Sequence, residues 1–135
     1  MYLLNGNESI KEIDIDYFNS ESRKMVEEGF KFIEEAYKSL GESVDVGVIY
    51  GSVAKNKAKE GSDIDLVFIC EDVENYDDLA KPLDKLVKKF DEYEVSPHLI
   101  RKSDLQDYKL LNYPPYLTKD RNDEKRFFEY YTNKK

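Results

Sequence analysis

The sequence of 135 residues contains a single cysteine, Cys70, and a single histidine, His98. One cysteine cannot form an internal disulfide, and one Cys with one His cannot supply a zinc site of the Cys/His kind. Cys70 closes an apolar run, so we expect a buried and unreactive thiol there. Disulfide-stapled scaffolds and zinc-binding modules are therefore excluded.

Long apolar runs are also missing. The longest ones are far too short to cross a bilayer, and residues 1–7 lack the basic region and apolar core of a secretion signal. We therefore expect a soluble, cytoplasmic protein with no membrane partner.

Positive charge is scarce relative to negative charge. The chain has 21 Lys and Arg against 29 Asp and Glu, a net charge of −8. Sequence-independent binding of nucleic acid needs a basic face that releases counterions from phosphate, so this composition disfavours it. The length fits one domain, residues 1–135, with a single core.

The most informative segment is residues 50–66, in which a Gly-Ser turn precedes two aspartates. Apolar runs at Val44–Tyr50 and Leu66–Cys70 predict a strand on either side of it. Because strand side chains alternate between faces, Asp63 and Asp65 should point the same way. Two parallel carboxylates form a hard oxygen site that suits Mg²⁺ shared with substrate phosphates.

This segment resembles the signature of the nucleotidyltransferase superfamily, which has the DNA polymerase beta-like fold, and in particular its small stand-alone, MNT-type members. The resemblance covers about residues 44–105. Asn56 stands where the family usually has a glycine, a mild exchange because Asn tolerates the left-handed conformation. The matching residues are Gly51, Ser52, Ser62, Asp63, Ile64, Asp65 and Leu66.

The resemblance implies an α/β (α+β) nucleotidyltransferase fold, a small mixed β-sheet with helices packed mainly on one face. It implies transfer of a nucleoside monophosphate from a nucleoside triphosphate, with ATP the expected nucleotide and Mg²⁺, or alternatively Mn²⁺, as cofactor. Asp63 and Asp65 would be catalytic and bind the metal. The expected nucleotide-binding residues are Gly51, Ser52, Lys55 and Ser62.

A third carboxylate is expected on the strand that follows the intervening helix, where active members use it to complete the metal site and to accept a proton. The predicted strand Val95–Ile100 places Ser96 at that position, and serine cannot replace a carboxylate as a base. Glu94 and His98 share the face of Ser96 and are candidate substitutes. The alternative is that both are ordinary surface residues.

A second interpretation follows from the absence of a clear third carboxylate. Small nucleotidyltransferases resemble antitoxins that pair with a helical HEPN-type protein. The alternative is therefore that the chain is a catalytically weak or inactive nucleotide-binding module that pairs with such a protein. Larger relatives carry a further helical domain for acceptor recognition, for which 135 residues leave little room. The sequence leaves open which nucleobase is preferred and which acceptor is used. It also leaves open the oligomeric state, and a homo-oligomer is one possibility.

Other charged motifs have ordinary explanations. Asp14 and Asp16 also form an Asp-x-Asp pair but lack an upstream Gly-Ser turn, so we interpret them as a solvated face. Lys55, Lys57 and Lys59 could offset triphosphate charge, with Lys55 the candidate, or could simply be solvated. Residues 51–62 do not end in Gly-Lys-Ser/Thr, which excludes a P-loop.

Periodicity predicts the remaining elements. A helix should begin near Ser20 or Ser22 and close at Gly41, and a second should start or kink near Pro82. Pro97 favours an edge position or a bulge for the third strand, because it removes a ladder donor. A helical turn is predicted over 53–59 and a short helix over 103–111. Residues 112–135 predict either a packed final helix or a segment that waits for a partner.

Overall fold

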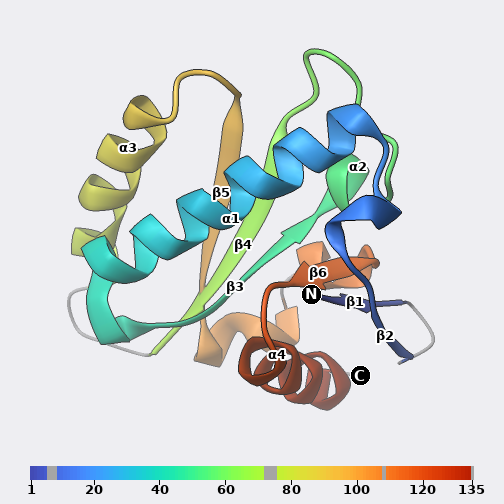
Figure 1. The fold of residues 1–135 in the computed structure, drawn as a ribbon. Helices are drawn as coiled ribbons and strands as arrows, with labels where there is room; N and C mark the ends of the chain where they lie inside the picture. Colours follow the sequence, from blue (N-terminus) through green and yellow to red (C-terminus); the bar gives the residue numbers. More distant parts are fainter. Residues whose placement is uncertain (6–8, 72–75, 108, 135) are drawn as a thin grey trace.

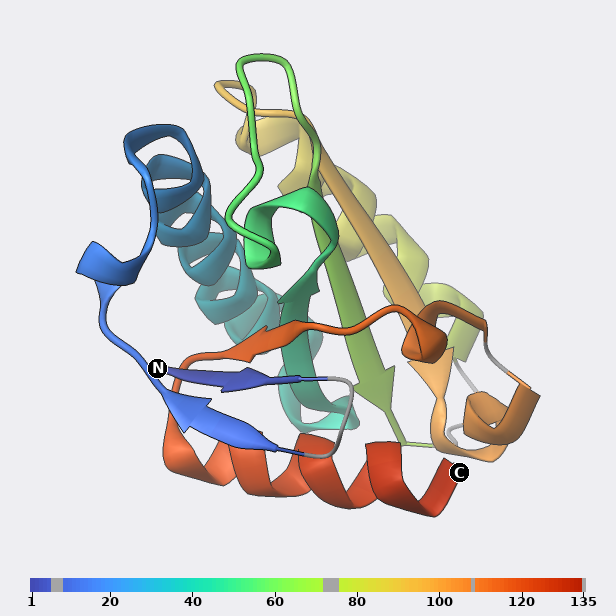
Figure 2. The same ribbon diagram turned by 90° about the vertical axis from the view of Figure 1, so that its right-hand side faces the viewer.

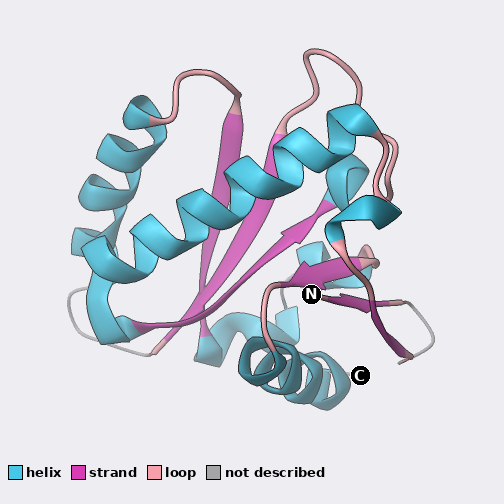
Figure 3. Cartoon of the chain, viewed as in Figure 1, coloured by secondary structure: helices cyan, strands magenta, loops and turns pink. Residues whose placement is uncertain are grey.

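The computed structural model describes residues 1–5, 9–71, 76–107 and 109–134 (Figure 1). Helices and strands alternate in a mixed α/β arrangement (Figure 3). In chain order they are β1 (Tyr2–Leu4), β2 (Ile10–Glu12), α1 (Ser20–Leu40), β3 (Val44–Tyr50), α2 (Gly51–Ala54), β4 (Ile64–Cys70), α3 (Ala80–Lys89), β5 (Val95–Arg101), β6 (Tyr116–Thr118) and α4 (Arg121–Lys134).

Within the described residues, six strands form one mixed sheet in the order β2-β1-β6-β3-β4-β5 (Figure 2). The β4–β5 pair is parallel, because α3 carries the chain back across the sheet, and the other pairs are antiparallel. The predicted small mixed sheet is confirmed. Strand β4 lies between β3 and β5, so the residues that begin it have a strand on each side.

Helix α1 is the longest element and packs closely on the sheet. The Asn19 side chain caps its start by accepting a hydrogen bond from the Ser22 N–H at 2.9 Å, and Gly41, with φ of +72°, ends it. At Gly29 a methyl group would come within 2.8 Å of the Ile49 side chain and 3.2 Å of the Ile64 side chain. Only glycine allows this helix to approach β3 and β4 so closely.

The sheet has a buried cluster on each face. On the face covered by α1 and α3, the cluster includes Met25, Phe32, Ile64, Leu66 and Phe68. On the other face, α4 covers a second cluster that includes Val48, Val67, Tyr116, Phe127 and Tyr131. Residues 112–135 therefore include a helix packed on the protein, which decides between the two predictions for this segment.

Asp45, near the start of β3, fastens α4 to the sheet. Its carboxylate accepts hydrogen bonds from the Tyr130 hydroxyl and, at 2.8 Å, from Arg126 Nη1. Lys102 Nζ lies 3.5 Å from the same carboxylate. Although burial opposes ionisation, the hydrogen bond from Tyr130 and the charges of Lys102 and Arg126 keep the pKa of Asp45 below its usual value.

Strand β5 is at the edge of the sheet, as Pro97 predicted. The Glu94 carbonyl accepts a hydrogen bond from the Ile64 N–H at 2.8 Å. By the two-residue period, Ser96 and His98 also turn their backbone groups toward β4, and the nitrogen of Pro97 faces outward. The proline therefore costs the sheet no internal hydrogen bond.

Pro82 starts a helix without disrupting it, since it is the third residue of α3, where no intrahelical donor is required. The helix predicted over residues 103–111 is instead two short 3-10 helices, Lys102–Asp107 and Lys109–Asn112. Leu105 and Leu111 are both buried in the second cluster. One straight α-helix would turn residues six apart toward different sides, so two separate turns satisfy both leucines.

The three-residue strands β1, β2 and β6 were not predicted, and the helical turn predicted over 53–59 is confined to α2. No helix among the described residues combines the length and the apolar character needed to cross a bilayer.

Candidate active site

The Gly-Ser turn connects β3 to α2 and lies against the second aspartate. Tyr50, the last residue of β3, pairs with Asp65 in the antiparallel ladder. Gly51 follows with φ of +72°, and a methyl group on it would come within 2.3 Å of Asp65 Oδ2. The absence of a side chain at this position is what allows the Asp65 carboxylate to lie over the backbone of the turn.

The two aspartates flank the first residue of β4. Ile64 and Leu66 are fully buried in the cluster beneath α1, whereas Asp63 and Asp65 are partly exposed. Burial and the negative charge of Asp63 raise the pKa of Asp65, and His98 opposes this shift. The carboxylates therefore repel each other electrostatically, an arrangement that favours a cation between them.

Strand β5 brings Ser96 next to the aspartates. The parallel register pairs Asp65 with Ser96, and the Ser96 hydroxyl donates to Asp63 Oδ2 at 3.5 Å. The expected position of a third carboxylate on the neighbouring strand is thus occupied by a serine.

The two candidate substitutes for that carboxylate lie on either side of Ser96. Glu94 is exposed at the start of the strand, and its hydrogen bond to Asp63, together with the negative charge of Asp63, raises the pKa of Glu94. His98 is also exposed and pairs with Val67, further along β4. Glu94 is therefore coupled electrostatically to Asp63, whereas His98 acts through its charge on Asp65.

The loop between the turn and the aspartates carries the other candidate residues. Lys55, Lys57 and Lys59 are all exposed. The Ser62 hydroxyl accepts a hydrogen bond from the Lys59 N–H at 2.9 Å, which closes a tight turn directly before Asp63. Asn56 has φ of +60°, so this residue does adopt the left-handed conformation that favours glycine.

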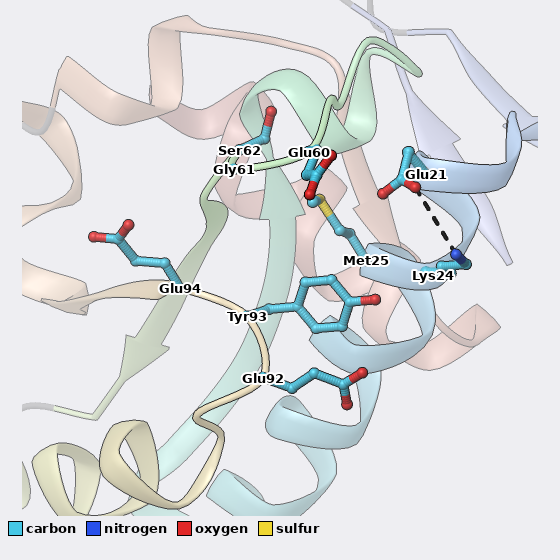
Figure 4. Close-up of a pocket in the computed structure, with 9 residues that line it drawn as sticks. All are labelled: Glu21, Lys24, Met25, Glu60, Gly61, Ser62, Glu92, Tyr93 and Glu94. Carbon is cyan, nitrogen blue, oxygen red and sulfur yellow. Dashed lines mark ion pairs between the residues drawn. The ribbon is translucent and has the colours of Figure 1, made fainter.

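A cavity of about 470 Å³ adjoins this loop (Figure 4). Tyr93 and the buried Met25 form its apolar part, and Glu21 pairs with Lys24 at 3.8 Å along α1 on one side of it. Ser62, which directly precedes Asp63, and Glu94 also line the cavity. The aspartates themselves are not among the residues that line it.

The donor set at the aspartate pair fits a hard divalent cation. Carboxylate oxygens are the ligands that Mg²⁺ prefers, and such a cation takes part of its shell from phosphates and water. Across the described ranges of the chain, no group of three His, Cys, Asp or Glu side chains is arranged to hold a metal ion. The protein therefore offers two carboxylates, Asp63 and Asp65, rather than a closed metal cage.

A family profile, "Polymerase beta, Nucleotidyltransferase", matches residues 31–129, well over half of the chain. The protein belongs to this nucleotidyltransferase family. The match extends beyond the region of resemblance seen in the sequence and takes in the second half of α1, residues 31–40, and most of α4. Nucleotidyltransferases of this family generally use divalent metal ions.

Solved structures agree with the fold. A Sulfolobus solfataricus protein that is provisionally assigned as a nucleotidyltransferase superposes with a TM-score of 0.52 at 16% identity, covering 81% of this chain and 91% of its own. A toxin-antitoxin structure with AMP-PNP gives a TM-score of 0.46 at 17% identity, covering 76% of this chain and 83% of that one, a likeness too weak to support a conclusion. No curated protein sequence matches the chain.

The second Asp-x-Asp pair belongs to a different element, the turn that precedes α1. The Asp14 side chain accepts a hydrogen bond from the Asp16 N–H at 2.9 Å and caps a 3-10 helix at Ile15–Tyr17. Asp16 is exposed and 4.0 Å from Arg23. The interpretation of these acids as a solvated face agrees with their exposure.

Proposed function

We propose that the protein transfers a nucleoside monophosphate from a nucleoside triphosphate, ATP first among the candidates, to an acceptor hydroxyl, with Mg²⁺ or Mn²⁺. The observation that carries this proposal is the Asp65 carboxylate lying against Gly51 while interacting with Asp63. The glycine turn, which can approach a phosphate, therefore lies beside a pair of acids that repel each other. The chain that carries this arrangement belongs to a nucleotidyltransferase family.

Each side chain has a role in this proposal. Asp63 and Asp65 would hold the divalent cation, which when bound neutralises triphosphate charge and stabilises oxygen charge in the transition state. The Gly51 turn and the Ser52 hydroxyl would donate to phosphate oxygens, with Ser62 nearby. Lys55 is exposed beside the turn and can reach outward to a phosphate.

The reaction itself requires an acceptor oxygen and a base. The acceptor hydroxyl forms a bond to the α-phosphorus, the bond between that phosphorus and the α–β bridging oxygen breaks, and pyrophosphate leaves. Glu94 is the better placed base for the hydroxyl proton, because its backbone bonds to Ile64, the residue between the two aspartates. His98 is the second candidate, further along β5.

Replacing both acids tests this mechanism. In the Asp63→Asn/Asp65→Asn variant we expect Mg²⁺-dependent nucleotide binding and pyrophosphate release to fall at least a hundredfold, since the cation loses both carboxylates. The matched control is Asp77→Asn/Asp78→Asn, which removes two exposed acids from the 3-10 helix that follows the far end of β4 and should retain full binding and turnover. Undiminished activity in the first variant would reject the mechanism.

A second candidate function rests on Ser96. A serine beside the aspartates, where a third carboxylate is expected, favours an antitoxin-type module that binds nucleotide weakly or without turnover and pairs with a HEPN-type helical protein. Calorimetric titration separates the two functions: Mg²⁺-dependent nucleotide binding with pyrophosphate release supports the enzyme. Tight association with a helical protein and no turnover supports the module.

A further inference from the structure

The loop of residues 55–62 is fastened to the start of α1 through Asn56. The Asn56 Oδ1 accepts a hydrogen bond from the Asn19 N–H at 2.8 Å, and its Nδ2 donates to the Tyr17 carbonyl at 3.3 Å. The Asn56 carbonyl in turn accepts from Asn19 Nδ2 at 3.0 Å. Asn19 and Asn56 lie 37 positions apart, so these contacts tie two distant parts of the chain together.

Asn19 serves two elements with one side chain. Its Oδ1 accepts from the Ser22 N–H and caps α1, while its Nδ2 donates to the loop. A short Asp or Ser cap could satisfy the helix end but could not donate an amide N–H to the Asn56 carbonyl. The same residue therefore sets where α1 begins and where the loop lies.

A second contact lies two residues further along the loop. The Ser22 side chain is fully buried, and its Oγ accepts a hydrogen bond from the Ala58 N–H at 3.1 Å. Ala58 is itself buried against the core. A buried N–H left without a partner is costly, so this bond opposes movement of the loop away from α1.

Helix α1 is in turn fixed to the strand that carries the aspartates. Gly29 brings the helix against the side chains of Ile49 and Ile64, and Ile64 separates Asp63 from Asp65. We call one set of polar contacts the α1 clamp: those made by Asn19, Ser22, Asn56 and Ala58. The clamp therefore holds the loop against α1, and α1 in turn packs against β4.

We infer that the α1 clamp positions Asp63 and Ser62 for cation and nucleotide binding, with Asn56 as its central positioning residue. Asp63 precedes the first residue of β4, so its backbone is set by the loop on one side and the strand on the other. A glycine at position 56 would adopt the same backbone conformation without strain but would make neither side-chain hydrogen bond. This inference rests on the proposed function of the aspartate pair.

Asn56→Gly tests the clamp with the backbone conformation preserved. Losing two side-chain hydrogen bonds should make the amides of Ala58 and Lys59 exchange on the order of tenfold faster with deuterium. With a fluorescent ATP analogue at fixed concentration, the MgCl₂ concentration needed for half-maximal binding should rise by roughly threefold to tenfold. Excess MgCl₂ should restore full binding.

Ser22→Ala is a second variant that acts on the other contact, and Ser39→Ala, at an exposed serine of the same helix, is its control. Ser22→Ala should shift both measurements in the same direction as Asn56→Gly, and Ser39→Ala should shift neither. Cation dependence is the deciding measurement once thermal unfolding shows each variant to be fully folded at the assay temperature, because a partly unfolded population would itself raise the half-maximal MgCl₂ concentration.

The outcomes separate the clamp from the proposed function. Unchanged amide exchange in Asn56→Gly would overturn the clamp itself, and faster exchange with unchanged cation dependence would overturn its positioning role. If the wild-type protein bound no ATP analogue in MgCl₂, the proposed function would fail and the positioning role with it. The exchange measurement would then still report on the contact between the loop and α1.

Discussion

Ser96 is the residue at which this chain differs most from the pattern of an active nucleotidyltransferase. It pairs with Asp65 across the β4–β5 ladder, and its hydroxyl reaches Asp63 at 3.5 Å. A hydroxyl can hydrogen-bond a carboxylate but brings no negative charge to a cation. The position is therefore occupied by a small neutral group.

Ser96→Asp should convert the pair of carboxylates into a set of three. We expect the apparent affinity for Mn²⁺ to rise by about tenfold, because cation affinity follows the number of charged ligands. Without the cation the third charge should lower Tm, since like charges repel. Calorimetric titration with MnCl₂ measures the first effect, and thermal unfolding with and without the ion measures the second.

Ser96→Asn is the matched control, because it has nearly the same shape as the aspartate variant but no charge. It should leave Mn²⁺ affinity close to that of the wild type. An equal gain in both variants, or a gain in neither, would contradict the view that a missing charge at position 96 limits cation binding.

The residues of the site differ in how far the sequence predicted them. Gly51, Asp63 and Asp65 belong to one contiguous motif, so spacing alone was sufficient to bring them together, and their proximity is seen in the structure. Asn19 and Ser22 were missed as partners of the loop. They are polar residues more than 30 positions away, and no periodic pattern connects them to it.

At the scale of elements, the Asp45 carboxylate provides a polar attachment of α4 to the sheet. Asp45 contacts Tyr130 and Arg126 on α4 and also Lys102. Phe127 and Tyr131 add apolar contacts on the inner side of the helix. The helix is therefore held by a buried aromatic side and by one acid near the start of β3.

Asp45→Ala should lower the free energy of unfolding by about 1–3 kcal/mol, because it removes a hydrogen-bond acceptor for two α4 side chains and one acidic partner of Lys102 and Arg126. Urea denaturation at pH 7 measures this loss. The effect should shrink at acid pH: since the pKa of Asp45 is lowered on folding, its stabilisation is present above its usual pKa and is lost as the pH falls through the lower folded value.

Asp104→Ala serves as the comparison, because it breaks an exposed pair with Arg101 and should change stability by less than about 1 kcal/mol. Nucleotide binding should be unaffected by Asp45→Ala, since Asp45 and Gly51 lie near opposite ends of β3. A loss of binding equal to that of the Asp63/Asp65 variant would contradict the separation of the two regions.

Long elements were predictable from sequence and short ones were not. Val26, Phe30, Ile33, Tyr37 and Leu40 repeat over many turns, and the bounds of α1 agree with that pattern. Strands β1, β2 and β6 have three residues each, too few for a two-residue alternation to stand out from chance. Their positions are fixed by pairing with strands that are distant in the sequence. A local residue pattern contains no information about such pairing.

At the scale of the whole molecule, the excess of acids leaves one carboxylate in an unfavourable position. Asp123, in the first turn of α4, is only 7% exposed. Burial, and then the neighbouring charge of Asp120, raise the pKa of Asp123 to about 6. Arg126, at 3.5 Å, only partly opposes these effects.

This carboxyl should make the protein more stable in weak acid than at neutral pH. A folded pKa above the unfolded value means that the native state keeps the proton longer, so stability from this group falls as the pH rises from about 4 to about 6. Asp123→Asn should therefore stabilise the protein by about 1–3 kcal/mol at pH 7 and by little near pH 4.

Thermal unfolding of both proteins between pH 4 and pH 8 measures this difference. Glu124→Gln removes the same charge from the same turn of α4 and should not reproduce the profile. A less stable Asp123→Asn protein at pH 7 would mean that the ion pair with Arg126 outweighs the cost of burial.

The expectations of a single domain and of a cytoplasmic location stay predictions.

The outward nitrogen of Pro97 has a consequence for how molecules of this protein meet in concentrated solution. An exposed edge invites a neighbouring chain to add a strand, which is the first step toward fibrils. Here Pro97 interrupts the outward row of N–H donors on β5, because it has no hydrogen to give to such a neighbour. The opposite margin, β2, is only three residues long and carries Lys11 and Glu12. Both borders of the sheet thus discourage intermolecular growth.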